Sequence, residues 1–201
     1  MAGKILVSTA YLPPVAYFSL ISDVDEVLIE KEENYLKQTY RNRCYILSAN
    51  GIQSLSVPVL LGSFHKTVIK NIRIDYSRRW QQVHLRALSA AYRASPYFEY
   101  YFEAIERIIS ARHEYLLDLN MELTTFFLES VKMKRKIKYT SHFAPVKNNP
   151  GDFRYNFSPK KEFKRDYKEY LQVFSERHGF VPGLSIADLL FNTGPDAPGF
   201  L

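Results

Sequence analysis

Short apolar runs separated by turn signals organise the first third of the chain, a pattern typical of a sheet protein. Lys4–Thr9 is apolar and β-branched, which predicts a buried strand that ends before Pro13-Pro14, because proline has no backbone donor. Val15–Ile21 has helical spacing, and Val24–Glu30 predicts a second strand. This β-α-β start places the loop 10–14 at the carboxyl end of a strand, where open α/β sheets bind ligands.

A hairpin is predicted in the next segment. Cys44–Leu47 and Gln53–Val59 have the apolar content of strands, and the Asn50-Gly51 pair between them is the strongest short-range hairpin signal. Thr67–Ile74 predicts a further strand with one half-buried face.

The hydrophobic period becomes helical from residue 79 onward. The predicted elements are helices at Arg79–Arg93, Tyr97–Arg112 and Leu116–Met133, a short strand at Lys138–Tyr139, a short helical or extended segment at Tyr167–Phe174 and a capped helix at Ser185–Asn192. Pro145–Lys161 is polar and contains turn signals, so we expect a flexible loop there, either a lid over a site or a simple connection. Together these elements predict one α/β domain over residues 1–201, with a mixed sheet from the N-terminal third, a helical layer and an irregular C-terminal segment.

Composition and charge indicate the kind of ligand and the cellular compartment, but not the function. Net charge is +6, which attracts anionic ligands, and aromatic residues make up 15% of the chain. The single cysteine, Cys44, excludes an internal disulfide and fits a reducing compartment. We find no signal peptide and no apolar run long enough to span a bilayer, so we expect a cytoplasmic protein. The basic run Lys132–Lys138 is either a solvated helix end or a patch for an acidic partner; it lacks aromatic residues, so we expect no stable nucleic-acid complex.

The stretch Tyr35–Arg43 is the strongest candidate for a binding site, with three cations and two phenols in nine residues. On a strand, Arg41 and Arg43 would share a face, and two adjacent guanidiniums suit a phosphate or carboxylate between them. We therefore predict an anion site held by Lys37, Arg41 and Arg43, with Tyr40 or Asn42 orienting the substrate. The alternative is a charged strand edge that prevents strand pairing.

Two histidines are candidate site residues. His84 shares a helix face with Trp80 and Leu88, a pattern that also fits a core residue. We predict it as the general base, because imidazole titrates near neutral pH. His142 follows a predicted strand end and is either a substrate contact or an ordinary surface residue.

Tyr11 and Asn120 complete the candidate set. Tyr11 lies in the loop predicted to shape the cleft, and Asn120 is either a helix cap or a substrate contact. No phosphate-binding loop, dinucleotide fingerprint, nucleophile elbow or paired-histidine helix occurs, which disfavours common nucleotide and serine hydrolases. We predict no metal, and no cofactor is identified.

Several segments together resemble the WbqC-like family of bacterial proteins. They are Tyr17–Ile21, Lys37 with Arg41–Arg43, His84-Leu85, Ala91-Tyr92, Pro96–Phe98, Leu117–Asn120 and Leu184–Pro195, the last of which is similar to the ending of Bacteroides-type members. One departure is Ser8-Thr9, where many family members carry Gln-Pro.

The resemblance implies a role in surface-polysaccharide (O-antigen) biosynthesis. It implies a cytoplasmic protein that binds or acts on a phosphorylated or nucleotide-activated small molecule, a nucleotide-sugar or an acyl or aminoacyl donor. We therefore expect a group-transfer enzyme. The alternatives are a non-catalytic binding or assembly protein of the envelope pathway and, with steeply salt-dependent affinity, an RNA-binding protein. Oligomeric state is not indicated by the sequence.

Overall fold

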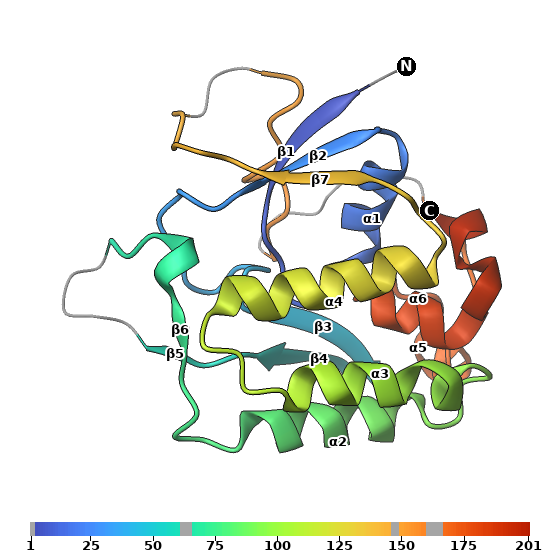
Figure 1. The fold of residues 1–201 in the computed structure, drawn as a ribbon. Helices are drawn as coiled ribbons and strands as arrows, with labels where there is room; N and C mark the ends of the chain where they lie inside the picture. Colours follow the sequence, from blue (N-terminus) through green and yellow to red (C-terminus); the bar gives the residue numbers. More distant parts are fainter. Residues whose placement is uncertain (1–2, 61–65, 146–148, 160–166) are drawn as a thin grey trace.

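The computed structural model describes residues 3–60, 66–145, 149–159 and 167–201 (Figure 1). Its central element is a parallel sheet of β1 (Lys4–Ser8), β2 (Glu26–Glu30) and β7 (Lys136–Tyr139), in the order β1-β2-β7. Helix α1 (Val15–Ser22) makes the crossover between β1 and β2. The predicted β-α-β start and the α/β fold class are both confirmed.

Alternation of apolar residues explains why these strands are buried on one face. Ile5 and Val7 in β1 and Val27 and Ile29 in β2 are all buried, and they pair directly in the register Ile5 with Val27 and Val7 with Ile29. Helix α1 is apolar on every side and buried along nearly its whole length, so it belongs to the core.

The predicted hairpin forms a separate antiparallel sheet of β3 (Arg43–Ser48) and β4 (Gly51–Ser56). Gly51 has φ of +99°, the conformation that its turn requires and that glycine adopts without cost. Because this hairpin does not pair with β1-β2-β7, the prediction of one mixed sheet is wrong in that detail.

The predicted strand at Thr67–Ile74 is also corrected. It contains a 3-10 turn, η1 (Ile69–Asn71), followed by the two-residue strand β6 (Arg73–Ile74), which pairs with β5 (Val59–Leu60). Ile69, Ile72 and Ile74 all reach the core, a spacing that a turn followed by a short strand satisfies and a single regular strand does not.

Three long helices follow the sequence prediction closely. They are α2 (Trp80–Tyr92), α3 (Phe98–Ser110) and α4 (Leu116–Ser130). Figure 1 shows the parallel sheet at one end of the molecule and α2 and α3 at the other, with α4 between them. The chain ends in α5 (Ser175–His178), α6 (Ile186–Thr193) and the 3-10 helix η2 (Gly194–Phe200). The predicted cap of α6 is confirmed, because Ser185 Oγ accepts a hydrogen bond from the Ala187 amide.

The predicted flexible loop at 145–161 is corrected where the structure describes it. Residues 149–159 run along the free edge of β1: the Leu6 amide donates to Gly151 and the Phe153 amide donates to Leu6, at 2.8 Å each. Arg154 is 2% exposed. Residues 151–153 therefore extend the folded edge beside β1, whereas 146–148 and 160–161 lie outside the described residues.

Candidate functional site

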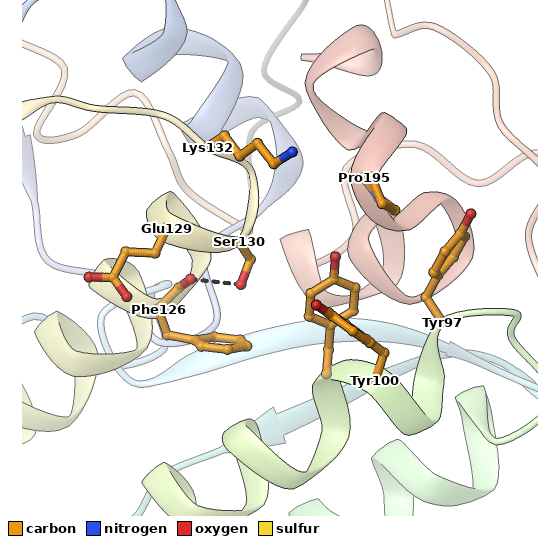
Figure 2. Close-up of a pocket in the computed structure, with 8 residues that line it drawn as sticks. Tyr97, Tyr100, Phe126, Glu129, Ser130, Lys132 and Pro195 are labelled. Atoms are coloured by element: carbon orange, nitrogen blue, oxygen red, sulfur yellow. Dashed lines mark hydrogen bonds between the residues drawn. The ribbon is translucent and has the colours of Figure 1, made fainter.

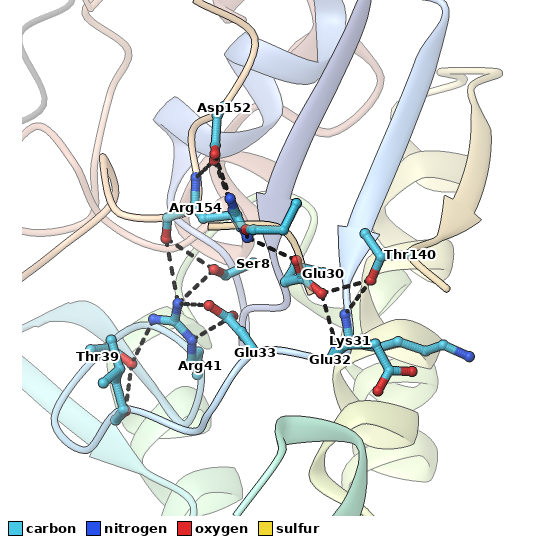
Figure 3. A network of polar contacts seen from close by, with 12 residues as sticks. Ser8, Glu30, Lys31, Glu32, Glu33, Thr39, Arg41, Thr140, Asp152 and Arg154 are labelled. Carbon is cyan, nitrogen blue, oxygen red and sulfur yellow. Dashed lines mark hydrogen bonds and ion pairs between the residues drawn. The ribbon is translucent and has the colours of Figure 1, made fainter. Parts of the chain in front are cut away.

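The carboxyl ends of the parallel strands carry a cluster of polar side chains. Ser8 and Glu30 are the last residues of β1 and β2, and Thr140 directly follows β7. Figure 3 shows β1 and β2 ending at a network that also includes side chains from 31–41 and 152–154. Parallel strands deliver their carboxyl ends to one edge, so topology alone gathers these groups.

Arg154 ties this edge together. Its Nη1 donates to Glu30 Oε2 and to the Ala144 carbonyl, each at 2.9 Å, and its Nε and Nη2 bind Asp152 at 2.9 and 2.6 Å. The side chains of Arg154 and Glu30 are 1% and 0% exposed. Glu30 Oε1 accepts from Thr140 Oγ1 at 2.6 Å, which connects β2 to β7.

Arg41 makes the second half of the network. Its Nε and Nη2 bind Glu33 at 2.8 and 2.6 Å, a bidentate pair whose side chains are 3% and 0% exposed. Nη2 also donates to Ser8 Oγ at 2.6 Å, and Ser8 donates to the Arg154 carbonyl at 2.9 Å. The two arginines therefore share Ser8 and belong to one network.

The network contains more carboxylates than arginines. Two arginines face the three carboxylates of Glu30, Glu33 and Asp152, which gives 2 − 3 = −1 when all are ionised. The hydrogen bond from Arg154 lowers the pKa of Asp152 below its usual range, and the pKa of Arg154 is raised in return. A net negative cluster does not attract a phosphate, so these arginines serve as scaffold.

Three aromatic rings cover cations at this edge. The Tyr155 ring lies 5.6 Å from the Arg41 guanidinium, the Phe143 ring 5.2 Å from that of Arg154, and the Tyr139 ring 5.7 Å from the Lys31 ammonium. These rings are 38%, 44% and 47% exposed in the same order. The edge therefore presents fixed aromatic faces to a ligand.

The interior of the site is small. Ser8, Thr9, Tyr40 and Arg41 help to line a cavity of about 10 Å³, which is room for a single water molecule. Thr9 Oγ1 is buried there without a hydrogen-bond partner among the described residues. This cavity is therefore too small to hold a ligand larger than water.

The prediction that Arg41 and Arg43 share a strand face is wrong. Strand β3 begins at Arg43, and Arg41 lies in the preceding turn with its guanidinium on Glu33. We expected a bound anion between the two guanidiniums. Instead, the Glu33 carboxylate binds the Arg41 guanidinium. Arg43 differs: it is half-buried, has no ion pair among the described residues, and its Nε has no partner there.

Arg43 nevertheless lies near the network. Burial raises the pKa of Tyr35 to about 12, and the charges of Arg43 and Arg41 both oppose that rise. Both guanidiniums are therefore close enough to act on the Tyr35 hydroxyl, and of the two only Arg43 lacks a carboxylate partner among the described residues.

His84 is a core residue. It is 3% exposed, its Nδ1 lies 2.9 Å from the Tyr11 hydroxyl, and the Trp80 ring packs edge-on at 5.1 Å. Burial lowers its pKa from 6.5 to about 4. The buried imidazole is not part of the polar cluster at the carboxyl edge, so we do not assign His84 as the base there. Tyr11, at 0% exposed, is the hydrogen-bond partner of His84 rather than a substrate contact.

Two predicted amides also have structural partners. Asn120 Nδ2 donates to the Arg41 carbonyl at 2.8 Å, and Asn42 Nδ2 donates to the Val57 carbonyl at 2.9 Å. Asn120 is thus neither a helix cap nor exposed: it is buried on α4 and positions the turn that carries Arg41.

The remaining predicted residues are accessible. Lys37 and His142 are exposed, and Tyr40 is half-buried, with its ring 5.9 Å from that of Tyr45. Burial raises the pKa of Tyr40 to about 12. His142 lies between Thr140 and Phe143 along the chain, and its Nδ1 is 3.1 Å from Ser141 Oγ.

Sequence reasoning missed the acidic half of the site. Glu30 is the last residue of an apolar strand, Glu33 comes three residues later, and Asp152 stands two residues before Arg154. A carboxylate at the carboxyl end of a buried strand was the available signal for Glu30. Nothing in the sequence indicated that Arg154 would pair with it across 124 positions.

The part of the chain that the structure describes has neither a metal-binding cluster nor a membrane-spanning helix. Among the described residues, no cluster of three His, Cys, Asp or Glu side chains could hold a metal ion. In that same part of the chain, no helix is both long and apolar enough to cross a membrane.

Comparison with known proteins adds a family match. The model of the WbqC-like protein family matches residues 9–158, more than half of the chain, and this range contains every residue of the network except Ser8. Uncharacterized protein Rv1507c of Mycobacterium tuberculosis is 28% identical over 226 aligned positions, which cover 98% of this chain and 96% of that protein. No solved structure matches the chain.

Proposed function

The chain belongs to the WbqC-like protein family, and on that premise we propose that it is a cytoplasmic group-transfer enzyme of surface-polysaccharide biosynthesis. Its substrate is a nucleotide-activated sugar or an acyl or aminoacyl donor bound at the carboxyl edge of β1-β2-β7. Its C-terminal segment Leu184–Pro195 supports placing it with the Bacteroides-type members of the family.

The observation that carries this proposal is the set of partly exposed rings of Tyr139, Phe143 and Tyr155 over a rigid charged base. Sugar rings and nucleobases both offer a flat face that stacks on an aromatic side chain. The buried ion pairs hold the edge in one geometry before a ligand arrives, which reduces the ordering cost of binding.

Arg43 and Lys37 are the cations assigned to the phosphate. Unlike Arg41 and Arg154, Arg43 has no carboxylate partner among the described residues, and Lys37 is exposed. A planar guanidinium suits a phosphate group. Tyr40, whose pKa is raised by burial, keeps its proton and can donate a hydrogen bond.

His142 is the group assigned to proton transfer. It is exposed and adjacent to Phe143, so a ligand on that ring comes within its reach. The carboxylates of Glu30, Glu33 and Asp152 are already engaged by arginines, which makes them poor bases.

That same engagement supports a second candidate, a non-catalytic binding protein of the envelope pathway. In that reading the edge binds the activated sugar and His142 has no role. Loss of turnover without loss of binding in His142→Ala would distinguish the enzyme from the binding protein.

We also propose that residues 1–201 form a single domain. The hydrophobic core joins Phe191 and Ile186 of the C-terminal segment with Tyr92 and Phe98 and with the strands of the sheet. The ring of Phe191 lies 5.3 Å from that of Tyr92 and 5.2 Å from that of Phe98.

A thermal-shift screen with nucleotide-sugars, acyl-coenzyme A species and inorganic phosphate tests the function. A ligand that binds the native state alone raises Tm by mass action. We expect a nucleotide-sugar or acyl donor to raise Tm, the rise to vanish in Arg43→Ala and Tyr155→Ala, and the control Leu171→Ala, at a residue 79% exposed, to keep it. No shift with any donor, or shifts unaffected by both variants, would refute the proposal.

A further inference from the structure

A second hollow lies on another part of the molecule, between the first turn of α3, the last turn of α4 and the start of η2 (Figure 2). It has a volume of about 640 Å³, within the range of small-molecule sites. None of its lining residues belongs to the network around Arg41 and Arg154. It is therefore a separate site.

Aromatic rings form its walls. Tyr97, Tyr100 and Tyr101 line it from α3 and Phe126 from α4. Tyr100 is 78% exposed, and its ring meets that of Tyr101 edge-on at 4.7 Å. The exposed Tyr100 ring therefore offers a face on which a ligand can stack, and the buried Tyr101 ring supports it from below.

The wall at Tyr97 is preorganised by Gly194. A Cβ at residue 194 would lie 2.5 Å from the Tyr97 ring, so the ring rests directly on glycine backbone. The Tyr97 amide also donates to the Phe191 carbonyl at 3.0 Å. The backbone and ring of Tyr97 are therefore held in a single conformation.

Hydroxyl groups and one ammonium surround the hollow. Figure 2 shows the Lys132 side chain extending from the end of α4 toward the side occupied by Pro195 and the tyrosines. Ser130 Oγ donates to the Phe126 carbonyl at 2.8 Å and keeps lone pairs to accept from a ligand. Lys132 adopts a φ of +53°, a conformation uncommon outside glycine, which turns the chain at this rim.

The charges at the hollow cancel. Glu129 and Lys132 contribute one charge of each sign. The N-terminus of α3 and the C-terminus of α4 both reach it, and these helix ends carry opposite partial charges. A phosphate group would meet one lysine and a helix N-terminus opposed by one carboxylate and a helix C-terminus, so the hollow offers no net positive charge and the balance favours an uncharged ligand.

We propose that this hollow binds a neutral sugar ring of a glycan. The apolar C–H face of the ring stacks on Tyr100, and its hydroxyls bond to the tyrosine hydroxyls, Ser130 and Lys132. The assignment is independent of the site at the carboxyl edge, because it uses different residues and a ligand without phosphate.

Saturation-transfer NMR on the full chain tests the assignment. The probes are neutral trisaccharides of glucose, galactose and mannose, with uridine monophosphate as the charged comparison. Titration calorimetry of the best trisaccharide then compares Tyr100→Ala with Leu171→Ala, both at exposed positions where the fold tolerates truncation. Tyr155→Ala reports on the carboxyl edge alone.

We expect transfer to a trisaccharide and about tenfold weaker binding in Tyr100→Ala, from loss of one aromatic face. Leu171→Ala and Tyr155→Ala should bind like the wild type. Transfer to uridine monophosphate alone, no transfer to any trisaccharide, or a Tyr100→Ala variant that binds unchanged would each overturn the proposal. Because the nucleotide-sugar screen depends on Arg43 and Tyr155, the two proposals fail independently.

Discussion

Arg154 and Glu30 are 124 positions apart in sequence, yet Arg154 Nη1 lies 2.9 Å from Glu30 Oε2 with both side chains buried. This pair joins the segment along the free edge of β1 to the end of β2. It fixes the carboxyl edge of the parallel sheet, where we place the ligand site.

Replacing Arg154 by methionine keeps an unbranched, flexible side chain and removes the charged guanidinium. Because Glu30 and Asp152 would then be buried without a cation, we expect the free energy of unfolding to fall by roughly 3 to 5 kcal/mol in urea titrations. The matched control is Arg73→Met, whose partner Glu114 is 56% exposed, and there we expect little change. Equal losses in both variants would contradict a structural role for the buried pair.

Alanine substitutions at Arg41 and Arg43 should affect different properties, stability in the first case and donor binding in the second, although the two residues are close in sequence. Arg41→Ala leaves Glu33 buried and unpaired, so we expect a loss of roughly 3 to 5 kcal/mol in stability. Arg43→Ala removes no ion pair among the described residues, so Tm should stay near that of the wild type while donor binding is lost. Measuring the Tm of both variants with and without donor separates the loss of stability from the loss of binding. An Arg41→Ala variant as stable as the wild type would contradict the structural role of Arg41.

The neutral state of His84 predicts a pH dependence of stability. The unfolded chain binds a proton near pH 6.5, whereas the folded state does so only near its lowered pKa of about 4. Stability should therefore fall by about 3 kcal/mol as pH drops from 6.5 to 4, and level off below that. His84→Gln, which still offers a partner to Tyr11, should flatten this slope. An NMR titration showing the His84 ring protonating near pH 6.5 in the native protein would exclude the mechanism.

Gly194 provides a prediction for the second hollow. It has φ of +53°, and a Cβ there would collide with the Tyr97 ring at 2.5 Å. We expect Gly194→Ala to lower stability by roughly 3 kcal/mol, from backbone strain and overpacking together. Gly199→Ala, in the same 3-10 helix but with open space around it, should change Tm only slightly. Similar Tm values for the two variants would show that the Tyr97 wall is not held in this way.

The elements of the fold could be predicted because each follows from a local pattern. The Asn50-Gly51 hairpin and the helix that becomes α2 depend on turn chemistry and on spacing alone. The strand predicted at Thr67–Ile74 failed because three isoleucines gave an apolar signal without fixing the backbone.

The polar network could be anticipated only in its general position. The predicted β-α-β start pointed to the carboxyl edge of the sheet, where the network lies, but the pairing of its charges is a long-range property. Arg41 carries the same charge as Arg43, and nothing local indicates that Glu33 neutralises one and not the other. His84 likewise showed a helical face with Trp80, a pattern shared by core residues and by general bases.

Hydrogen–deuterium exchange of the full chain, with and without the donor that raises Tm most, tests the central claim most directly. The account predicts slower exchange on binding in residues 139–145 and 153–157, which carry the three aromatic rings and Arg154. Slowed exchange confined to residues 97–101 and 126–132, or no change at the carboxyl edge, would contradict it.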